Sequence, residues 1–118
     1  MGDRVAAFPA RVRTGPTIRG RTMYGTVMRA KAKPGNRQAV VAMMGEGVDT
    51  KGFHATHVLV PDDDDRTLIA AILFEDDAAY SANAHDPATE EWYGRFRALL
   101  EADPEWTDGG WHSFLPSR

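Results

Sequence analysis

Four histidines are the candidates for proton transfer near neutral pH in this chain. His54 and His57 lie three residues apart in a β-rich run, so a regular strand points them to opposite faces and they do not bind one metal ion together. In such a strand His57 shares its face with Phe53, Ala55 and Leu59. This pattern fits either a hydrogen-bonded inner histidine or the base of an apolar pocket, and His57 is the candidate catalytic base.

A second polar group precedes an Asp-Pro pair. Asn83 and His85 come just before Asp86-Pro87, which predicts an N-cap followed by proline at the first helical position. A break between two helices exposes polar groups, so Asn83 and His85 are candidate catalytic contacts at a pocket rim. The alternative is that both only satisfy backbone groups at the break.

The candidate substrate-binding walls are Tyr24, Phe74, Tyr80 and Trp92. For the two tyrosines and the tryptophan, a place in the core is the alternative.

Other chemistries lack the residues that they need. The chain has no cysteine, which excludes a disulfide scaffold, a thiolate zinc site and a cysteine nucleophile. The four aspartates over 62–65 lack the alternating oxygen ligands, the central glycine and the distal glutamate of a calcium-binding loop. No serine lies in a nucleophile elbow, and no glycine-rich phosphate loop occurs. We therefore expect no metal ion and no nucleotide-binding site.

Length and charge indicate one domain behind a basic leading segment. The 118 residues carry 14 basic and 17 acidic side chains, a net charge of −3, and fit one ordinary domain. Residues 1–40 contain nine of the basic side chains and one acidic side chain. We expect an extended or disordered basic arm over 1–20 and a single domain over 21–118. The arm lacks interleaved aromatic residues and precedes an acidic body, so we do not expect nucleic acid as a partner.

Hydropathy gives no sign of a membrane partner. The longest apolar run, over 68–74, is far shorter than the roughly 20 residues that cross a bilayer. Residues 1–20 contain no apolar stretch of the kind found in secretory signals. We expect a cytoplasmic protein.

Periodicity and turn residues predict the element order βαββαβ, with two helical pieces in the second α position. The expected elements are strands over 22–33, 53–60, 67–74 and 106–114, and helices over 37–45, from 78, and over 88–101. The predicted fold class is α+β, a ferredoxin-like sandwich with a four-stranded antiparallel sheet and helices on one face. The strand over 67–74 is apolar on both faces, so the uncovered face of the sheet is expected to meet a second copy in a homodimer.

Five short motifs follow one another along the chain, and their order and spacing match those of a known family. They are MRAKAKPG at 28–35, GF at 52–53, LFEDDAAY at 73–80, PEW at 104–106 and DGGW at 108–111. Together they resemble the antibiotic-biosynthesis-monooxygenase-like family of the dimeric α+β barrel superfamily, over roughly residues 24–114. Enzymes of that family oxidise polycyclic phenols or anthrones to quinones without metal or flavin. The resemblance therefore implies a cofactor-independent monooxygenase that acts on a small aromatic molecule.

Two alternatives stay open. The motifs specify a fold and none demands catalysis, so the chain could instead be a non-catalytic dimer that binds a small ligand or a partner. Haem-degrading relatives use an asparagine on the first strand, a tryptophan at the end of the third and a histidine ligand on the following helix. This chain has no asparagine over 21–33, Phe74 at the tryptophan position, and Asn83 where the histidine is common. His85, two residues later, keeps the haem alternative open.

Overall fold

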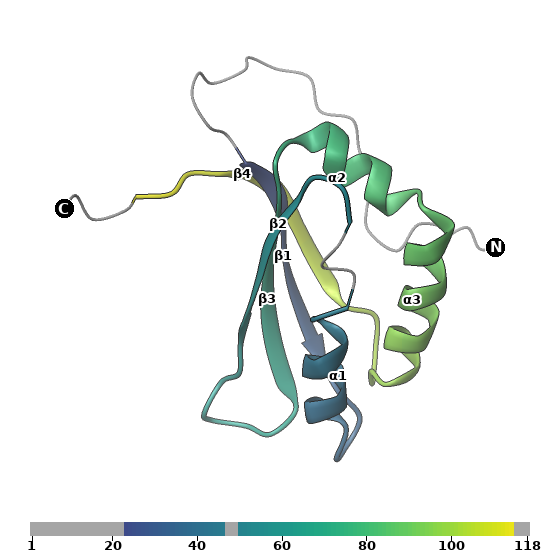
Figure 1. Cartoon of the computed structure of the whole chain (residues 1–118). Helices are drawn as coiled ribbons and strands as arrows, with labels where there is room; N and C mark the ends of the chain where they lie inside the picture. Colours follow the sequence, from purple (N-terminus) through teal and green to yellow (C-terminus); the bar gives the residue numbers. More distant parts are fainter. Residues whose placement is uncertain (1–22, 47–49, 115–118) are drawn as a thin grey trace.

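The computed structural model describes residues 23–46 and 50–114 (Figure 1). The elements in chain order are β1 (Met23–Lys31), α1 (Arg37–Met43), β2 (Phe53–Leu59), β3 (Thr67–Phe74), α2 (Asp77–Ala84), α3 (Pro87–Ala98) and β4 (Glu105–Trp111). Every expected strand and helix is present, which confirms the order βαββαβ with a divided second helix. The predicted basic arm over 1–20 lies outside the described residues. None of the helices in the described ranges is long and apolar enough to cross a membrane.

The strands form one antiparallel sheet in the order β2-β3-β1-β4. This is the predicted ferredoxin-like α+β arrangement. The two central strands, β1 and β3, pair in a register that places Tyr24 opposite Phe74. Their close approach requires a glycine at position 25, because a Cβ atom on Gly25 would lie 1.8 Å from the carbonyl oxygen of Ile72.

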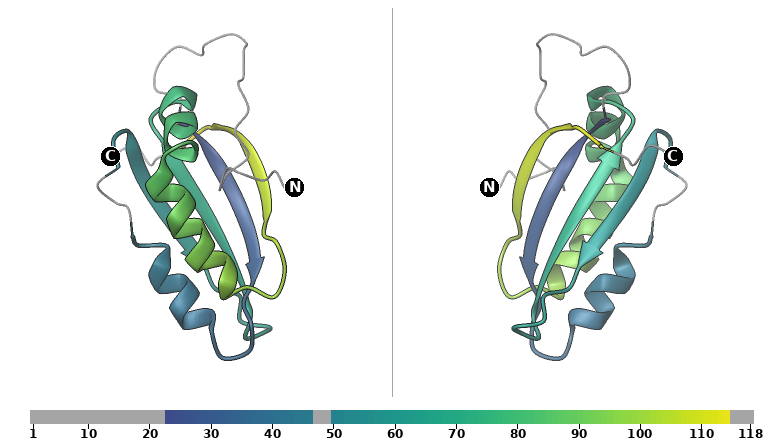
Figure 2. Two further views of the ribbon diagram at one scale, coloured as in Figure 1. Left: turned by 90° about the vertical axis from the view of Figure 1, so that its right-hand side faces the viewer. Right: turned by 90° about the vertical axis from the view of Figure 1, so that its left-hand side faces the viewer.

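The helix-facing side of the sheet carries the core. Alternate residues of the central strands point to this side, among them Met28, Ala70 and Phe74, which are at most 2% exposed. Val40 of α1 and Phe96 of α3 are fully buried in the same cluster. Figure 2 shows the helices on this side of the sheet in one view and the strands in front of them in the opposite view. The described helices therefore leave the other face of the sheet uncovered.

Side-chain caps set where the second and third helices begin. Asp76 accepts a hydrogen bond from the backbone N–H of Ala79 at 2.9 Å and starts α2. Asp86 accepts one from the backbone N–H of Ala88 at 2.8 Å and starts α3, which has proline at its first position. The Asp86 cap is as the sequence predicts, whereas α2 begins at Asp77, one residue before the expected start at 78.

The third helix ends earlier than its apolar stripe suggests. We expect it to reach residue 101, but α3 ends at Ala98. The chain after it pairs with the end of the first strand instead. The backbone N–H of Lys33 donates to the carbonyl oxygen of Leu99 at 2.9 Å, and Leu100 forms a β-bridge with Ala32. Backbone pairing with a distant segment thus replaces the last helical turn.

Candidate functional site

A cavity of about 300 Å³ lies between the helices and the β2–β3 half of the sheet. Its walls come from the residues after α1, from β2 and β3, from the break between α2 and α3, and from α3 itself. The volume falls at the lower end of the range of roughly 300–1,000 Å³ that is typical of small-molecule sites. The cavity can therefore hold a small ligand.

Aromatic side chains form the apolar wall of the cavity. Phe53 and Phe74 both line it and meet edge to face, with ring centroids 5.7 Å apart. Trp92 also lines it and stacks on Phe96 at 4.7 Å with an interplanar angle of 15°. The indole Nε1 of Trp92 donates to the carbonyl oxygen of Met43 at 3.1 Å, which fixes the ring. The structure places Phe74 and Trp92 at the cavity, and their predicted substrate-binding role stays a prediction.

The polar end of the cavity lies at the α2–α3 break. Asn83, Asp86 and Thr89 all line it there. The hydroxyl of Thr89 donates to the Oδ1 atom of Asn83 at 3.0 Å. Asp86 uses its Oδ1 atom as the cap of α3. The cavity thus has aromatic walls and one end that carries amide, hydroxyl and carboxylate groups.

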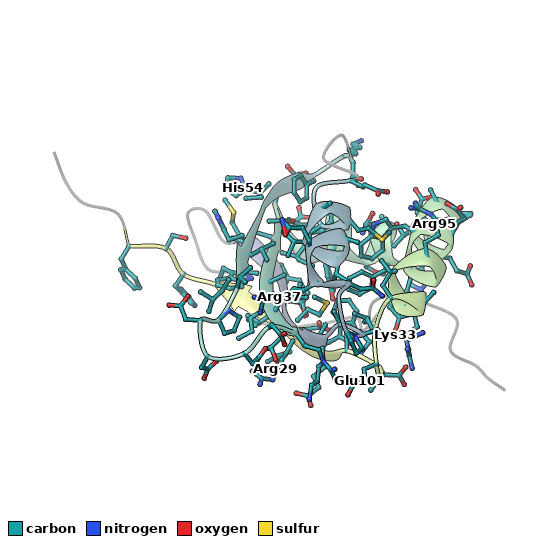
Figure 3. The ribbon with its side chains drawn as sticks, turned by 90° about the horizontal axis from the view of Figure 1, so that it is seen from below. Arg29, Lys33, Arg37, His54, Arg95 and Glu101 are labelled. Carbon is teal, nitrogen blue, oxygen red and sulfur yellow. The ribbon has the colours of Figure 1, made fainter. Side chains whose placement is uncertain are left out.

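Exposed charged residues mark the solvent side of the cavity. Arg95 of α3 donates from Nη2 to Oε1 of Glu46 at 3.1 Å, and its Nε atom lies 3.6 Å from Oε2 of Glu91. All three residues line the cavity, and all three are exposed. The hydrogen bond that Arg95 donates to Glu46 raises the pKa of the Arg95 guanidinium. Figure 3 shows Arg95 projecting from α3.

The catalytic candidate His57 does not lie in this cavity. A β-bulge between Phe53 and Ala55 shifts the register of β2. Phe53 and Thr56 consequently line the cavity, whereas His57 pairs with Ala71 on the uncovered face of the sheet and is exposed. The predicted common face of Phe53 and His57 is therefore wrong, because the alternation of a regular strand is interrupted by one extra residue.

The other histidines also lie away from the cavity. His85 is exposed at the C-cap of α2, where its Nδ1 atom donates to the carbonyl oxygen of Ser81 at 2.9 Å. The haem alternative depends on His85, which does not line the cavity. Figure 3 shows His54 on the far side of the sheet from α3. In the part of the chain that the structure describes, no group of three or more histidine, aspartate or glutamate side chains is placed to hold a metal ion.

Two tyrosines support the aromatic wall from behind. The ring of Tyr80 lies 5.8 Å from that of Phe74 and 5.3 Å from that of Tyr24. The Tyr80 hydroxyl donates to Oδ1 of Asp108 at 2.8 Å. Burial, followed by this hydrogen bond, raises the pKa of the Tyr80 phenol far above its ordinary value. Neither tyrosine is part of the cavity lining, so their predicted contact with a ligand would be indirect in this arrangement.

Comparison with known proteins identifies the architecture. The sequence matches no protein-family model and no curated protein. Among solved structures, a variant of SnoaB, a cofactor-independent oxygenase from Streptomyces nogalater, is 20% identical with a TM-score of 0.68, over 83% of this chain and 100% of that chain. A Streptomyces coelicolor monooxygenase in complex with nanaomycin D is 20% identical with a TM-score of 0.67, over 82% of this chain and 94% of that chain. A Nitrosomonas europaea protein of unknown function is 20% identical with a TM-score of 0.63, over 82% of this chain and 97% of that chain.

The chain has the fold of the antibiotic biosynthesis monooxygenases. This confirms the resemblance inferred from the sequence motifs. The similar Nitrosomonas protein is described as a protein of unknown function. Fold alone therefore does not identify a reaction, and the chemistry has to be argued from the cavity.

Three residues at or behind the cavity were not predicted from the sequence, namely Thr89, Arg95 and Asp108. Thr89 and Arg95 each lie three residues from Trp92, and this spacing places all three on one side of a helix. That shared face is the signal that could have identified them. Asp108 is harder to find, because its only signal is a carboxylate on the strand face that also carries Trp106.

Proposed function

We propose that this chain binds a small planar aromatic molecule in the cavity and oxidises it with dioxygen, without metal or flavin. The observation that carries the proposal is the cavity itself, in which Phe53, Phe74 and Trp92 form aromatic walls and Asn83 lies at the polar end. Two proteins of the same fold support it, since SnoaB is a cofactor-independent oxygenase and the S. coelicolor monooxygenase holds nanaomycin D. As expected from the sequence, we place this activity in the cytoplasm.

An anthrone-type substrate supplies the electrons for this reaction. Removal of a proton from the ring carbon gives an enolate, which passes electrons to dioxygen. Overall the anthrone loses two hydrogen atoms and gains one oxygen atom to become a quinone, and the second oxygen atom leaves as water. The protein then needs dry walls, a proton acceptor and a hydrogen-bond donor for the enolate oxygen. In our proposal the Asn83 amide is this donor, and the carboxylates that the cavity offers as proton acceptors are Glu46, Asp86 and Glu91.

The test is oxygen uptake by the metal-stripped protein with anthrone as substrate. We expect turnover in the unmodified protein and a rate lower by on the order of 10²-fold in Asn83→Ala, the usual effect of removing a donor to a developing oxyanion. Gln38→Ala, on the exposed face of α1, is the matched control and should keep the full rate.

Two outcomes would contradict the proposal in different ways. A rate lost in His57→Ala but kept in Asn83→Ala would move the chemistry to the uncovered face of the sheet. Quinone binding by the unmodified protein without any oxygen uptake would favour the alternative of a non-catalytic ligand-binding protein.

We also propose that two copies pair through the uncovered face of the sheet. Ala71 and Ile69 of β3 point to this face and are half-buried, and Leu59 beside them is 60% exposed. An apolar sheet face is stable when a second layer covers it, and a symmetric dimer supplies one. Native mass spectrometry should give a dimer for the unmodified protein and a monomer for Ala71→Arg. Gln38→Arg should stay dimeric, and a monomeric unmodified protein would contradict this assembly.

A further inference from the structure

The side-chain oxygen of Asn83 is already bonded within the protein. Thr89 donates its hydroxyl proton to Oδ1 of Asn83 at 3.0 Å, across the break between α2 and α3. Over residues 23–46 and 50–114, neither side chain has another hydrogen-bond partner. A threonine hydroxyl has a single proton to donate, so this bond uses it completely.

The backbone holds both residues at this separation. The carbonyl oxygen of Asn83 accepts from the backbone N–H of Asp86 at 3.1 Å, and the backbone N–H of Thr89 donates to the carbonyl oxygen of Asp86 at 2.9 Å. The side chain of Asp86 caps the same helix through Ala88. The end of α2 and the start of α3 are therefore tied together by the residue between them, and the bond from Thr89 to Asn83 is set by local structure.

This bond determines which end of the amide is available to a ligand. A carboxamide has an acceptor oxygen on one side and a nitrogen with two N–H donors on the other. With Oδ1 of Asn83 directed to Thr89, the Nδ2 donors face away from Thr89. If the amide turned over, Nδ2 could donate to the hydroxyl oxygen, but the hydroxyl proton would lose Oδ1 of Asn83, its one acceptor among the described residues in this structure.

We propose that Thr89 is a positioning residue that orients the Asn83 amide, so that the cavity selects aromatic ligands carrying an acceptor oxygen. Both residues line the cavity, and both are half-buried. The acceptor is a quinone or ketone carbonyl, or the enolate formed from one. The choice of an aromatic ligand rests on the proposed function, whereas the selection of an acceptor oxygen rests on the Thr89–Asn83 bond.

The test compares two probes that share a ring skeleton. 2-Methyl-1,4-naphthoquinone carries acceptor oxygens, and 2-methylnaphthalene carries none. Binding is followed by quenching of tryptophan fluorescence, since Trp92 lines the cavity, and the chain has no cysteine thiol that the quinone could alkylate. We expect the unmodified protein to prefer the quinone by about tenfold, the equivalent of one net hydrogen bond.

Two substitutions at Thr89 separate the hydroxyl from the volume of the side chain. Thr89→Ser keeps the donor and should keep the preference for the quinone. Thr89→Val keeps the shape without the donor, and it should lose the preference while it binds 2-methylnaphthalene as the unmodified protein does. The ¹⁵N–¹H signals of the Asn83 side-chain amide report orientation directly. They should shift with the quinone in the unmodified protein and no longer do so in Thr89→Val.

The outcomes are separable from those of the proposed function. A quinone preference that survives in Thr89→Val, or that is absent from the unmodified protein, overturns the inference. If Thr89→Val does not fold, Asn83→Leu must abolish the same preference, and its survival there overturns the inference equally. An unmodified protein that prefers the quinone but takes up no oxygen with anthrone refutes the oxygenase proposal alone.

Discussion

Removal of the Tyr80 hydroxyl perturbs the buried polar pair behind the cavity wall. Tyr80 is 2% exposed, and its hydroxyl links α2 to β4 through Oδ1 of Asp108 at 2.8 Å. The second carboxylate oxygen of Asp108 is buried and has no hydrogen-bond partner among the described residues. Tyr80→Phe keeps the ring contacts with Tyr24 and Phe74 and removes the donor to the carboxylate.

The expected cost follows from the loss of a charge-assisted hydrogen bond. Such a bond contributes about 1.5–3 kcal/mol, and its loss leaves the Asp108 carboxylate desolvated with one donor fewer. We therefore expect Tyr80→Phe to lower the free energy of unfolding by about 2–3 kcal/mol. Adding Asp108→Val removes the uncompensated carboxylate, so the double variant should recover at least about 1 kcal/mol relative to Tyr80→Phe.

The same pair makes stability depend on alkaline pH. The pKa of Tyr80 is raised in the folded protein, chiefly by burial and then by the bond to Asp108. Above about pH 10 the unfolded chain loses the phenolic proton while the folded chain keeps it. The folded state then binds more protons, so the free energy of unfolding falls as pH rises, by about 1.4 kcal/mol per pH unit from this group. The phenylalanine variant lacks this contribution, so its deficit should shrink above pH 10.

Urea unfolding followed by circular dichroism at neutral and alkaline pH measures these effects in the unmodified protein and both variants. Gln38→Ala, exposed on α1, is the control for a substitution outside the pair. Two results would refute the claim that the buried Asp108 carboxylate lacks a second hydrogen-bond donor. One is a loss of unfolding free energy below about 0.5 kcal/mol in Tyr80→Phe, and the other is a double variant no more stable than Tyr80→Phe alone. A deficit that stays constant above pH 10 would refute the raised pKa of Tyr80.

Three further predictions concern the framework around the site. Gly25→Ala places a methyl group 1.8 Å from a backbone oxygen and should lower the free energy of unfolding by more than about 3 kcal/mol. Gly94→Ala in α3 meets open space and should raise it by about 0.5–1 kcal/mol, and urea unfolding measures both changes. Two backbone N–H groups and the nearby Arg37 hold the pKa of Asp64 at about 2, which an NMR titration should find. The stability from Asp64 is then present above its ordinary pKa of 3.8 and is lost as pH falls towards 2, and a titration near 3.8 would contradict this. Asp76→Ala removes the cap of α2 and should cost about 1 kcal/mol, and an unchanged melting temperature would show that the cap contributes nothing.

Local signals in the sequence were sufficient to predict most of the fold. The strand over 67–74 has the predicted bounds, because its continuous apolar run is limited by the aspartate turn before it and by the acidic residues after it. Asp86 starts its helix as predicted, because a cap depends on the few residues beside it. The end of α3 was not predictable in the same way, since it depends on a bridge between Ala32 and Leu100 that is distant in sequence.

The candidate site was predictable only in part, for a geometric reason. Phe74, Asn83 and Trp92 line the cavity because their predicted elements place them on the helix side of the sheet or at the helix break. His57 is on the other side because of a bulge near Phe53, and no glycine or proline within that strand indicates the bulge. One extra residue reverses the face of every side chain after it, so alternation predicts a face only for an unbroken strand.

The absence of histidine from the cavity lining restricts the chemistry that this site suits. All four histidines belong to the described residues, and none of them lines the cavity, whose ionisable groups are Glu46, Asp86, Glu91 and Arg95. Glu46 and Glu91 pair with Arg95, and carboxylates as a class are weak bases. Weak bases suit substrates that ionise readily, and the enolate of an anthrone is stabilised by its two fused rings. The proposed oxidation therefore relies on the acidity of the substrate and on the Asn83 donor, and it should tolerate Glu46→Gln or Glu91→Gln far better than Asn83→Ala.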